Sequence, residues 1–209
     1  MFVVTIDQQG SRTHGDRVDA LLSELGATPE AHRPFARTVG DEVQAVYADA
    51  VPLLDVVLRV LRGGGWSVGI GAGPVDEPLP AEARAGSGAA FVLARDAVEA
   101  AKSRQRAVPL VVRGQDELAA SDAEAVLVLV AAIAARRSPA GWDAIDAVRA
   151  AGASARQGEV ARTLGISQQA VSQRLRTALW AEEVAARGAA ERLLAAAQGQ
   201  PRPARSPSS

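Results

Sequence analysis

The chain has 209 residues, of which 48% are hydrophobic and 22% charged, so it can bury a packed core and is not expected to be disordered as a whole. Its formal net charge of −1 gives the whole chain no electrostatic attraction to nucleic acid, so any basic surface must be local. The absence of cysteine excludes disulfide bonds and thiolate metal sites. No apolar run reaches the length of a membrane span, and the N-terminus lacks the basic flank of a secretion signal. We therefore expect a soluble, cytoplasmic protein with no membrane partner.

The first half of the chain mixes the periodicities of strands and helices. We predict strands at 1–6, at 66–73, at 107–114 and on both sides of a tight turn within 35–47, with helices at 16–26, from Pro52 to the glycines at 63–65, and at 88–104. Residues 74–86 contain three prolines and read as a loop. This order predicts an α+β fold, a ferredoxin-like βαββαβ core with an extension, which we place in residues 1–115.

The second half has helical patterns only, and we place a helical domain in residues 116–197. Ser121 and Glu124 have the spacing of a capping box at the start of one helix, and Ser138 with Pro139 begins another that runs to Gly152. Residues 179–197 either continue the preceding helix or start a new one. Their apolar stripe is interpreted as a packing or dimer surface and consists of Leu179, Val184, Leu193 and Leu194. Residues 198–209 are rich in proline, serine and arginine and are expected to be disordered.

The clearest functional pattern is "QGEVARTLGISQQAVSQRL", at residues 157–175. A short helix at about 156–164 meets Gly165, which suits a tight turn because glycine adopts the left-handed conformation readily. A second helix begins at Ser167, a favourable N-cap, while Ile166, Val171 and Leu175 are expected to point inward. Residues 151–180 contain four arginines and one glutamate, a local positive charge that suits contacts with phosphates.

This segment resembles the helix-turn-helix of bacterial transcription regulators. Glutamine can bridge adenine and arginine can bridge guanine in the major groove. The resemblance implies double-stranded DNA as the partner, read by a homodimer on a two-fold site. The expected DNA-binding residues are Ser167, Gln168, Gln169, Ser172, Gln173, Arg174 and Arg176. The alternative is an ordinary helical hairpin with a polar surface.

In the first half, Asp7 ends the first predicted strand and Asp41 lies in the predicted hairpin turn. A βαββαβ sheet places these positions side by side, and paired carboxylates suit Mg²⁺ bound with a nucleotide. We expect Asp7 and Asp41 as metal ligands, and backbone amides from Gln8 to Ser11 as a phosphate cradle. The expected nucleotide-binding residues are Gln8, Gly10, Ser11, Arg12 and Arg95. The alternative is that both acids cap turns and face water.

The segments "VVTIDQQGSR", "RTVGDEVQAVY" and "WSVGIGAGPV" resemble the catalytic domains of class III nucleotide cyclases and, more distantly, GGDEF proteins. Arg95 stands at the position of a transition-state arginine in that resemblance, whereas Phe91 stands where asparagine is expected. Over most of residues 1–180 the chain is similar to the SatD family, in Asp7, Gly10–Arg12, Asp16 and Arg17, and in "GDEVQAV", "GIGAG" and "LGISQQAVSQRL". That resemblance implies a cyclase-like sensor fused to a DNA reader.

The sequence thus predicts a DNA-binding transcription regulator, controlled by a nucleotide bound to a degenerate cyclase-like domain. One alternative is an enzyme, a nucleotidyl cyclase or related phosphoryl-transfer protein with an accessory helical domain. A second is an adaptor whose helical half binds a partner protein. We favour the regulator, because Phe91 departs from the cyclase pattern and no purine-selecting Lys/Asp pair can be placed.

Overall fold

The computed structural model describes residues 1–26, 30–103, 105–152 and 157–199, apart from the side chain of Arg12. Within these residues the fold is α+β, with one mixed sheet of five strands. The strands are β1 (Phe2–Gln8), β2 (Arg33–Arg37), β3 (Glu42–Tyr47), β4 (Trp66–Ala72) and β5 (Leu110–Gly114). The helices are α1 (Ser11–His14), α2 (Val18–Leu25), α3 (Ala50–Gly63), η1 (Ala83–Ala85), α4 (Ala89–Ala101), α5 (Glu117–Ala134), α6 (Pro139–Ala151), α7 (Gln157–Leu164), α8 (Gln168–Thr177) and α9 (Trp180–Ala197).

The strand order in the sheet is β2-β3-β1-β4-β5. Strand β1 lies at the centre and pairs antiparallel with both β3 and β4, and β2 pairs antiparallel with β3. Strand β5 is added at the edge, parallel to β4. The register places Asp7 directly between Glu42 on β3 and Ser67 on β4. The C-terminal end of β1 therefore meets the hairpin between β2 and β3.

Alternation along the strands divides the core between the two faces of the sheet. Phe2, Val4 and Ile6 belong to the main core, which also contains side chains of α3, α5 and α9. Val3 points to the opposite face and packs with Ala90 and Phe91 of α4. Because successive residues of a strand alternate between faces, one strand contributes to both cores.

Helix α4 lies directly against β4, and two glycines make this approach possible. A Cβ atom built on Gly69 would lie 2.3 Å from the backbone nitrogen of Val98, and one on Gly71 would lie 2.1 Å from the carbonyl oxygen of Ala90. Neither backbone atom can move aside as a flexible side chain would. The first two glycines of "GIGAG", Gly69 and Gly71, therefore have a packing role at the β4–α4 contact.

We expect Gly71→Ala to lower the free energy of unfolding by about 1–3 kcal/mol or more, because the added methyl group must push α4 away from the sheet. Gly63→Ala is the matched control, since a Cβ at Gly63 would have nothing within 4 Å. Urea denaturation followed by circular dichroism measures both. Equal stabilities of the two variants would contradict the close contact between β4 and α4.

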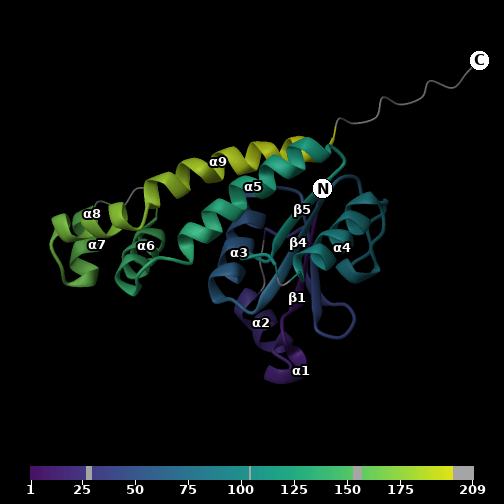
Figure 1. Ribbon diagram of the computed structural model, residues 1–209, viewed down its shortest axis with the longest axis horizontal. Coiled ribbons are helices and arrows are strands. Elements are labelled where there is room, and N and C mark those ends of the chain that lie inside the picture. Colours follow the sequence, from purple (N-terminus) through teal and green to yellow (C-terminus); the bar gives the residue numbers. More distant parts are fainter. Residues whose placement is uncertain (27–29, 104, 153–156, 200–209) are drawn as a thin grey trace, which may run out of the picture.

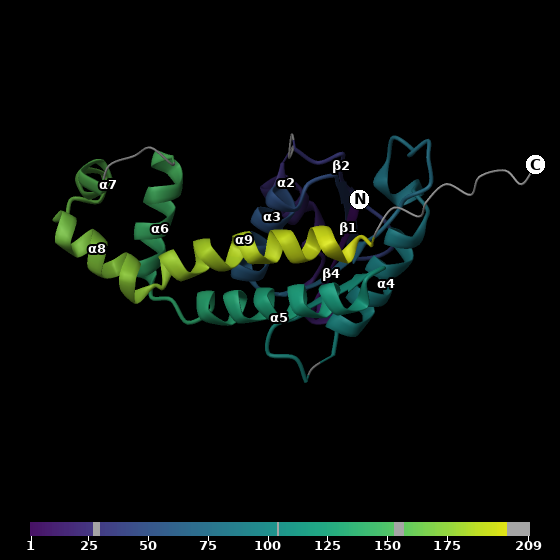
Figure 2. The same cartoon turned by 90° about the horizontal axis from the view of Figure 1, so that it is seen from above.

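Helices α5 and α9 run side by side from the sheet to the opposite end of the molecule, where α6, α7 and α8 lie (Figures 1 and 2). Near the sheet, Leu127 of α5 and Leu194 of α9 are buried in the main core. Helices α6–α8 form a separate small core around Val160, Ala161 and Val171. We expected a domain boundary between residues 115 and 116, which would assign α5 and α9 to the helical domain. These two helices instead cover the sheet and contribute to its core, so this boundary does not separate the two cores.

Several element boundaries differ from the predicted ones. Helix α5 begins four residues before Ser121, because Asp116 is its N-cap and its side chain accepts a hydrogen bond from the Ala119 amide at 3.0 Å. The prediction of a capping box from Ser121 to Glu124 was wrong. Residues 179–197 start a new helix, since Leu179 adopts a left-handed conformation between α8 and α9. The apolar stripe expected there divides: Leu194 is buried and Leu193 packs against the core, while Leu179 and Val184 are exposed.

The two ends of the described chain meet beside the sheet. The amino group of Met1 donates a hydrogen bond to the side chain of Gln198, just after α9. The rest of the tail expected to be disordered, residues 200–209, lies outside the described residues. Among the helices of the described ranges, none is by itself both long and apolar enough to cross a membrane; α5 and α6 meet that test only together, and they are bent by 117°.

Candidate functional site

Helices α7 and α8 form a helix-turn-helix at the end of the molecule far from the sheet (Figure 1). Gly165 has a φ of 64°, the left-handed conformation predicted for the turn. Ser167 caps α8, and its Oγ accepts a hydrogen bond from the Ala170 amide at 3.2 Å. Val171 is buried, and Ile166 and Leu175 pack against the same core, so all three side chains point inward as predicted. These contacts confirm the predicted local geometry of this segment.

The outward face of α8 consists of the side chains expected to contact DNA. Ser167, Gln168, Gln169, Gln173 and Arg176 are exposed, and Ser172 and Arg174 are half-buried. Two of them are held by α7. The Ser172 hydroxyl donates to the side-chain oxygen of Gln157 at 2.9 Å, and the amide nitrogen of Gln168 lies over Gly158.

The remaining exposed side chains share one helical face. Gln169, Gln173 and Arg176 are spaced four and three residues apart, so they lie above one another along α8. Gln173 has a weak contact with Thr177 at 3.4 Å on the same helix. Residues 157–177 contain three arginines and one glutamate, so the segment of α7 and α8 is locally basic although the chain as a whole is not. Arg156, which we counted in the expected charge, lies outside the described residues.

A second polar site lies at the C-terminal end of β1. Asp7, Gln8 and Gly10 line a cleft of about 510 Å³ together with Ser67 and Lys102. The Asp7 carboxylate is 14% exposed and pairs with the Lys102 ammonium at 3.0 Å. Lys102 also contacts Glu99 at 2.6 Å, one turn back on α4.

The backbone around Gln8 is only partly available as a phosphate cradle. The amide of Gln8 donates to the carbonyl of Asp41 at 3.2 Å, and the amide of Gln9 donates to the carbonyl of Gly65 at 2.9 Å. The prediction that the backbone amides from Gln8 to Ser11 bind phosphate is therefore wrong for Gln8 and Gln9, whose amides are already hydrogen-bonded within the chain. The Gln8 side chain is buried and holds the following loop, through the Gly15 carbonyl at 2.6 Å and the Arg17 amide at 2.8 Å.

The other expected nucleotide contacts do not gather at this cleft. Arg95 lines a different cleft on the same side of the sheet, with Glu42, Gln44 and Ser87. Ser11 is the first residue of the short helix α1 and is half-buried. The side chain of Arg12 lies outside the described residues. The grouping of Arg95 with Gln8 and Gly10 into one site was therefore wrong.

Sequence reasoning missed Lys102, Arg106, Gln9 and Ser67 as residues of the β1 cleft. Lys102 is the C-cap of α4, and its contact with Asp7 had no local signal in the sequence. Arg106 is held beside the cleft by Glu124 of α5 at 2.8 Å. Pairing of Gln9 with Ser67, at 3.1 Å, depends on the sheet register and has no local signal.

Burial raises the pKa of the Asp7 carboxyl, and the charges of Asp41 and Glu42 act in the same direction, whereas Lys102 opposes them. Burial works to lower the pKa of Lys102, but its hydrogen bonds with Glu99 and Asp7 raise that pKa overall. The Asp7 carboxylate is thus repelled by the negative charges of Asp41 and Glu42 and attracted by the positive charge of Lys102.

We expect Asp7→Asn to raise the free energy of unfolding at pH 7. The folded chain binds the Asp7 proton more tightly than the unfolded chain does, so the ionised carboxylate costs stability above its folded pKa. This cost disappears below the unfolded pKa of about 3.9, so the two proteins should become equally stable in acid. Urea denaturation between pH 3 and 7 measures the difference, with the exposed Asp122→Asn as control. A less stable variant at pH 7 would contradict this sign.

The carboxylates near β1 fit a divalent cation in part. Asp7 lies close enough to Asp41 and Glu42 for their charges to raise its pKa, and carboxylate oxygens suit Mg²⁺. Glu42 is engaged by the Thr38 hydroxyl at 2.6 Å, and Asp7 by Lys102. In the described parts of the chain, no cluster of three or more His, Cys, Asp or Glu side chains is arranged to hold a metal.

Comparisons of the chain with protein-family models, with curated proteins and with solved structures found no match.

Proposed function

We propose that the protein is a DNA-binding transcription regulator that reads duplex DNA with α8. The observation that carries this proposal is the exposed face of α8, where Gln169, Gln173 and Arg176 share one side of a helix capped by Ser167. A recognition helix needs polar side chains that reach base edges and a positive surround for phosphates. The position of α7 and α8 at one end of the molecule supports this use, because the sheet and its helices lie at the other end (Figure 2).

We further propose that the sheet domain is a ferredoxin-like, cyclase-like sensor, in keeping with the resemblance to the SatD family. The strand order β2-β3-β1-β4, with antiparallel pairs throughout, supports this assignment, and β5 is then the extension. Its effector would be a nucleotide in the cleft beside Asp7 and Lys102, with Mg²⁺ bound by Asp7 and Asp41.

Such a regulator acts on chromosomal DNA and belongs in the cytoplasm. A single recognition helix has limited affinity, so we propose that it binds as a homodimer.

The experiment that tests DNA reading is binding of the purified chain to genomic fragments, followed by mapping of the enriched sites. A sequence-specific regulator selects a few fragments, and its affinity falls steeply as salt rises, because bound phosphates release counterions. Absence of binding, or binding that salt does not weaken, would reject the proposal and favour a protein-interaction adaptor.

The alternative function is a nucleotidyl cyclase or related phosphoryl-transfer enzyme. The feature that favours it is the charge of Asp41 and Glu42 beside Asp7 at the end of β1. Incubation with ATP or GTP and Mg²⁺ tests for a product, which must disappear in Asp41→Ala. If the site only senses a nucleotide, the nucleotide with Mg²⁺ raises the melting temperature of the wild type but not of Asp41→Ala, and no product forms.

A further inference from the structure

The reading helix belongs to a unit whose attachment to the rest of the molecule is unusually polar. We define the reader unit as α6–α8, which has its own small core, and the body as the sheet with α1–α5 and α9. A cavity of about 690 Å³ lies between them, lined by residues of α3, α5, α6 and α9 that include Trp142 and Trp180. The two parts are therefore not packed together here as a continuous apolar core.

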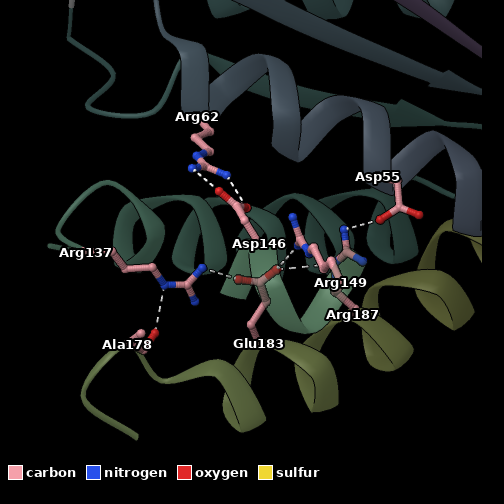
Figure 3. A network of polar contacts seen from close by, with 8 residues as sticks. All are labelled: Asp55, Arg62, Arg137, Asp146, Arg149, Ala178, Glu183 and Arg187. Carbon is pink, nitrogen blue, oxygen red and sulfur yellow. Dashed lines mark hydrogen bonds and ion pairs between the residues drawn. The ribbon is translucent and has the colours of Figure 1, made fainter. Parts of the chain in front are cut away.

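The centre of the polar attachment is Glu183 on α9, whose side chain is 4% exposed. Arg137, in the connection between α5 and α6, pairs with this carboxylate at 2.5 Å and donates to the Ala178 carbonyl at 2.7 Å. Arg149 of α6 reaches the other oxygen of Glu183 at 3.0 Å. One carboxylate thus joins the start of α9, the end of α6 and the chain that enters the reader unit (Figure 3).

A second link joins α6 to the body from the opposite side of the cavity. The guanidinium of Arg62 on α3 donates to both oxygens of Asp146, each at 2.7 Å, and stacks over Trp142 at 3.7 Å. Arg187 of α9 pairs with Asp55 of α3 at 2.6 Å and so ties the two body helices to each other (Figure 3). Both side chains of the Arg62–Asp146 pair are partly exposed, at 35% and 47%.

Helices α8 and α9 are separated by Ala178 and Leu179, of which Leu179 has a left-handed backbone conformation. Leu179 has φ 53° and ψ 44°, a left-handed conformation that L-residues other than glycine, asparagine and aspartate rarely adopt. Strained single residues persist where surrounding contacts hold them. The hydrogen bond from Arg137 to the carbonyl of Ala178 holds the residue just before Leu179.

We propose that these ion pairs form a latch between body and reader unit, and that opening the latch lets the reader unit pivot about Leu179. The latch consists of Glu183 with Arg137 and Arg149, and of Arg62 with Asp146. Opening it replaces charged contacts by water, whereas separation of a packed apolar interface would expose hydrophobic surface. The orientation of α8 relative to the body is then set by the latch. Its effect on DNA binding rests on the function proposed above, but the motion itself does not.

The absence of cysteine in the chain allows a direct measurement of that motion. Cysteines replacing Ser121 on α5 and Thr163 on α7, both exposed, carry spin labels for pulsed electron resonance distances. We expect one narrow distance distribution in the parent and a broader or displaced one in Arg62→Gln, in Asp146→Asn and in Glu183→Gln. High salt should broaden the parent distribution in the same way, because it screens the exposed Arg62–Asp146 pair.

The matched controls are Arg59→Gln, one turn before Arg62 on α3, and Glu182→Gln, beside Glu183 on α9; both native side chains are exposed. These variants should keep the parent distribution. Unchanged distances in folded Arg62→Gln and Asp146→Asn would overturn the proposal. If Glu183→Gln fails to fold, the distances in Arg62→Gln and Asp146→Asn test the proposal by themselves. Circular dichroism can verify that these two variants remain folded.

A second measurement connects the latch to DNA. If the reader binds DNA as proposed, opening the latch should change its affinity for a selected site about 5-fold or more, the size of a typical coupling between sites. Distances that change in a protein without specific DNA binding would uphold the latch and reject the DNA reader. Specific DNA binding with unchanged distances would uphold the DNA reader and reject the latch.

Discussion

The double variant Gln169→Ala/Arg176→Ala should bind its selected DNA site about 30- to 10⁴-fold more weakly than the wild type. Each side chain is exposed on the outer face of α8. A bidentate contact of glutamine with adenine or of arginine with guanine contributes about 1–3 kcal/mol of discrimination, and two such contacts account for the expected loss. Neither side chain contributes to the core of the reader unit, so folding should be unchanged.

Fluorescence anisotropy with labelled duplexes measures this loss on a selected site and on a scrambled one. Arg192→Ala, an exposed arginine of α9 outside the reader unit, controls for the loss of one positive charge. Arg162→Ala should weaken binding to both duplexes alike and reduce the salt dependence, as expected for a phosphate contact. A double variant that retains wild-type preference for the selected site would remove α8 from the role of recognition helix.

Replacement of Glu183 by alanine should lower the free energy of unfolding by about 3–5 kcal/mol, the usual cost of removing one partner of a buried ion pair. The Arg137 side chain is only 2% exposed, so its guanidinium would lose its carboxylate without gaining water. Burial lowers the pKa of Arg149, and the charge of Arg187 acts in the same direction, while Glu183 favours its charged form. Removal of the carboxylate therefore leaves three arginines close together.

Urea denaturation followed by circular dichroism measures this effect. Glu182→Ala removes a carboxylate from the next position of α9, which is exposed, and should change stability by no more than about 0.5 kcal/mol. Arg62→Ala, in the partly exposed pair, should cost less than Glu183→Ala because water can solvate the Asp146 carboxylate that is left without its partner. If Glu183→Ala and Glu182→Ala unfold at the same urea concentration, the buried network has no stabilising role.

Much of the segment formed by α7 and α8 could be predicted from the sequence because its signals are local. Gly165 in the turn, Ser167 at the N-cap and Val171 in the small core depend on backbone conformation and on neighbours within a few residues. The short β-branched run in "MFVVTI" and the strand-turn-strand pattern that ends in "EVQAVY" likewise indicate strands without reference to the rest of the chain. The starts of helices were less predictable, as α5 shows, because Asp116 and Ser121 are both acceptable caps in isolation.

The composition of the β1 cleft and of the latch was decided by the tertiary structure. Lys102 meets Asp7 across 95 residues of sequence, and Arg137 meets Glu183 across 46. Such pairs form only when a helix has one particular displacement and rotation against its neighbours. The pattern of apolar residues indicates which face of the helix is buried, but it does not specify that displacement or rotation. Arg95 was grouped with Asp7 and Gln8 by resemblance, although it lines a different cleft from the one that contains those two residues.

The sequence by itself determined the mixed α+β class, the turn and cap of the helix-turn-helix, and the polar outer face of α8, since each depends on short-range periodicity and backbone preference. Only the tertiary structure decided that α5 and α9 cover the sheet, that Lys102 lies against Asp7, and that Glu183 joins the reader unit to the body. The physical reason is that apolar patterning indicates which face of a helix is buried but not what buries it. Which charges meet is settled only when the helices pack.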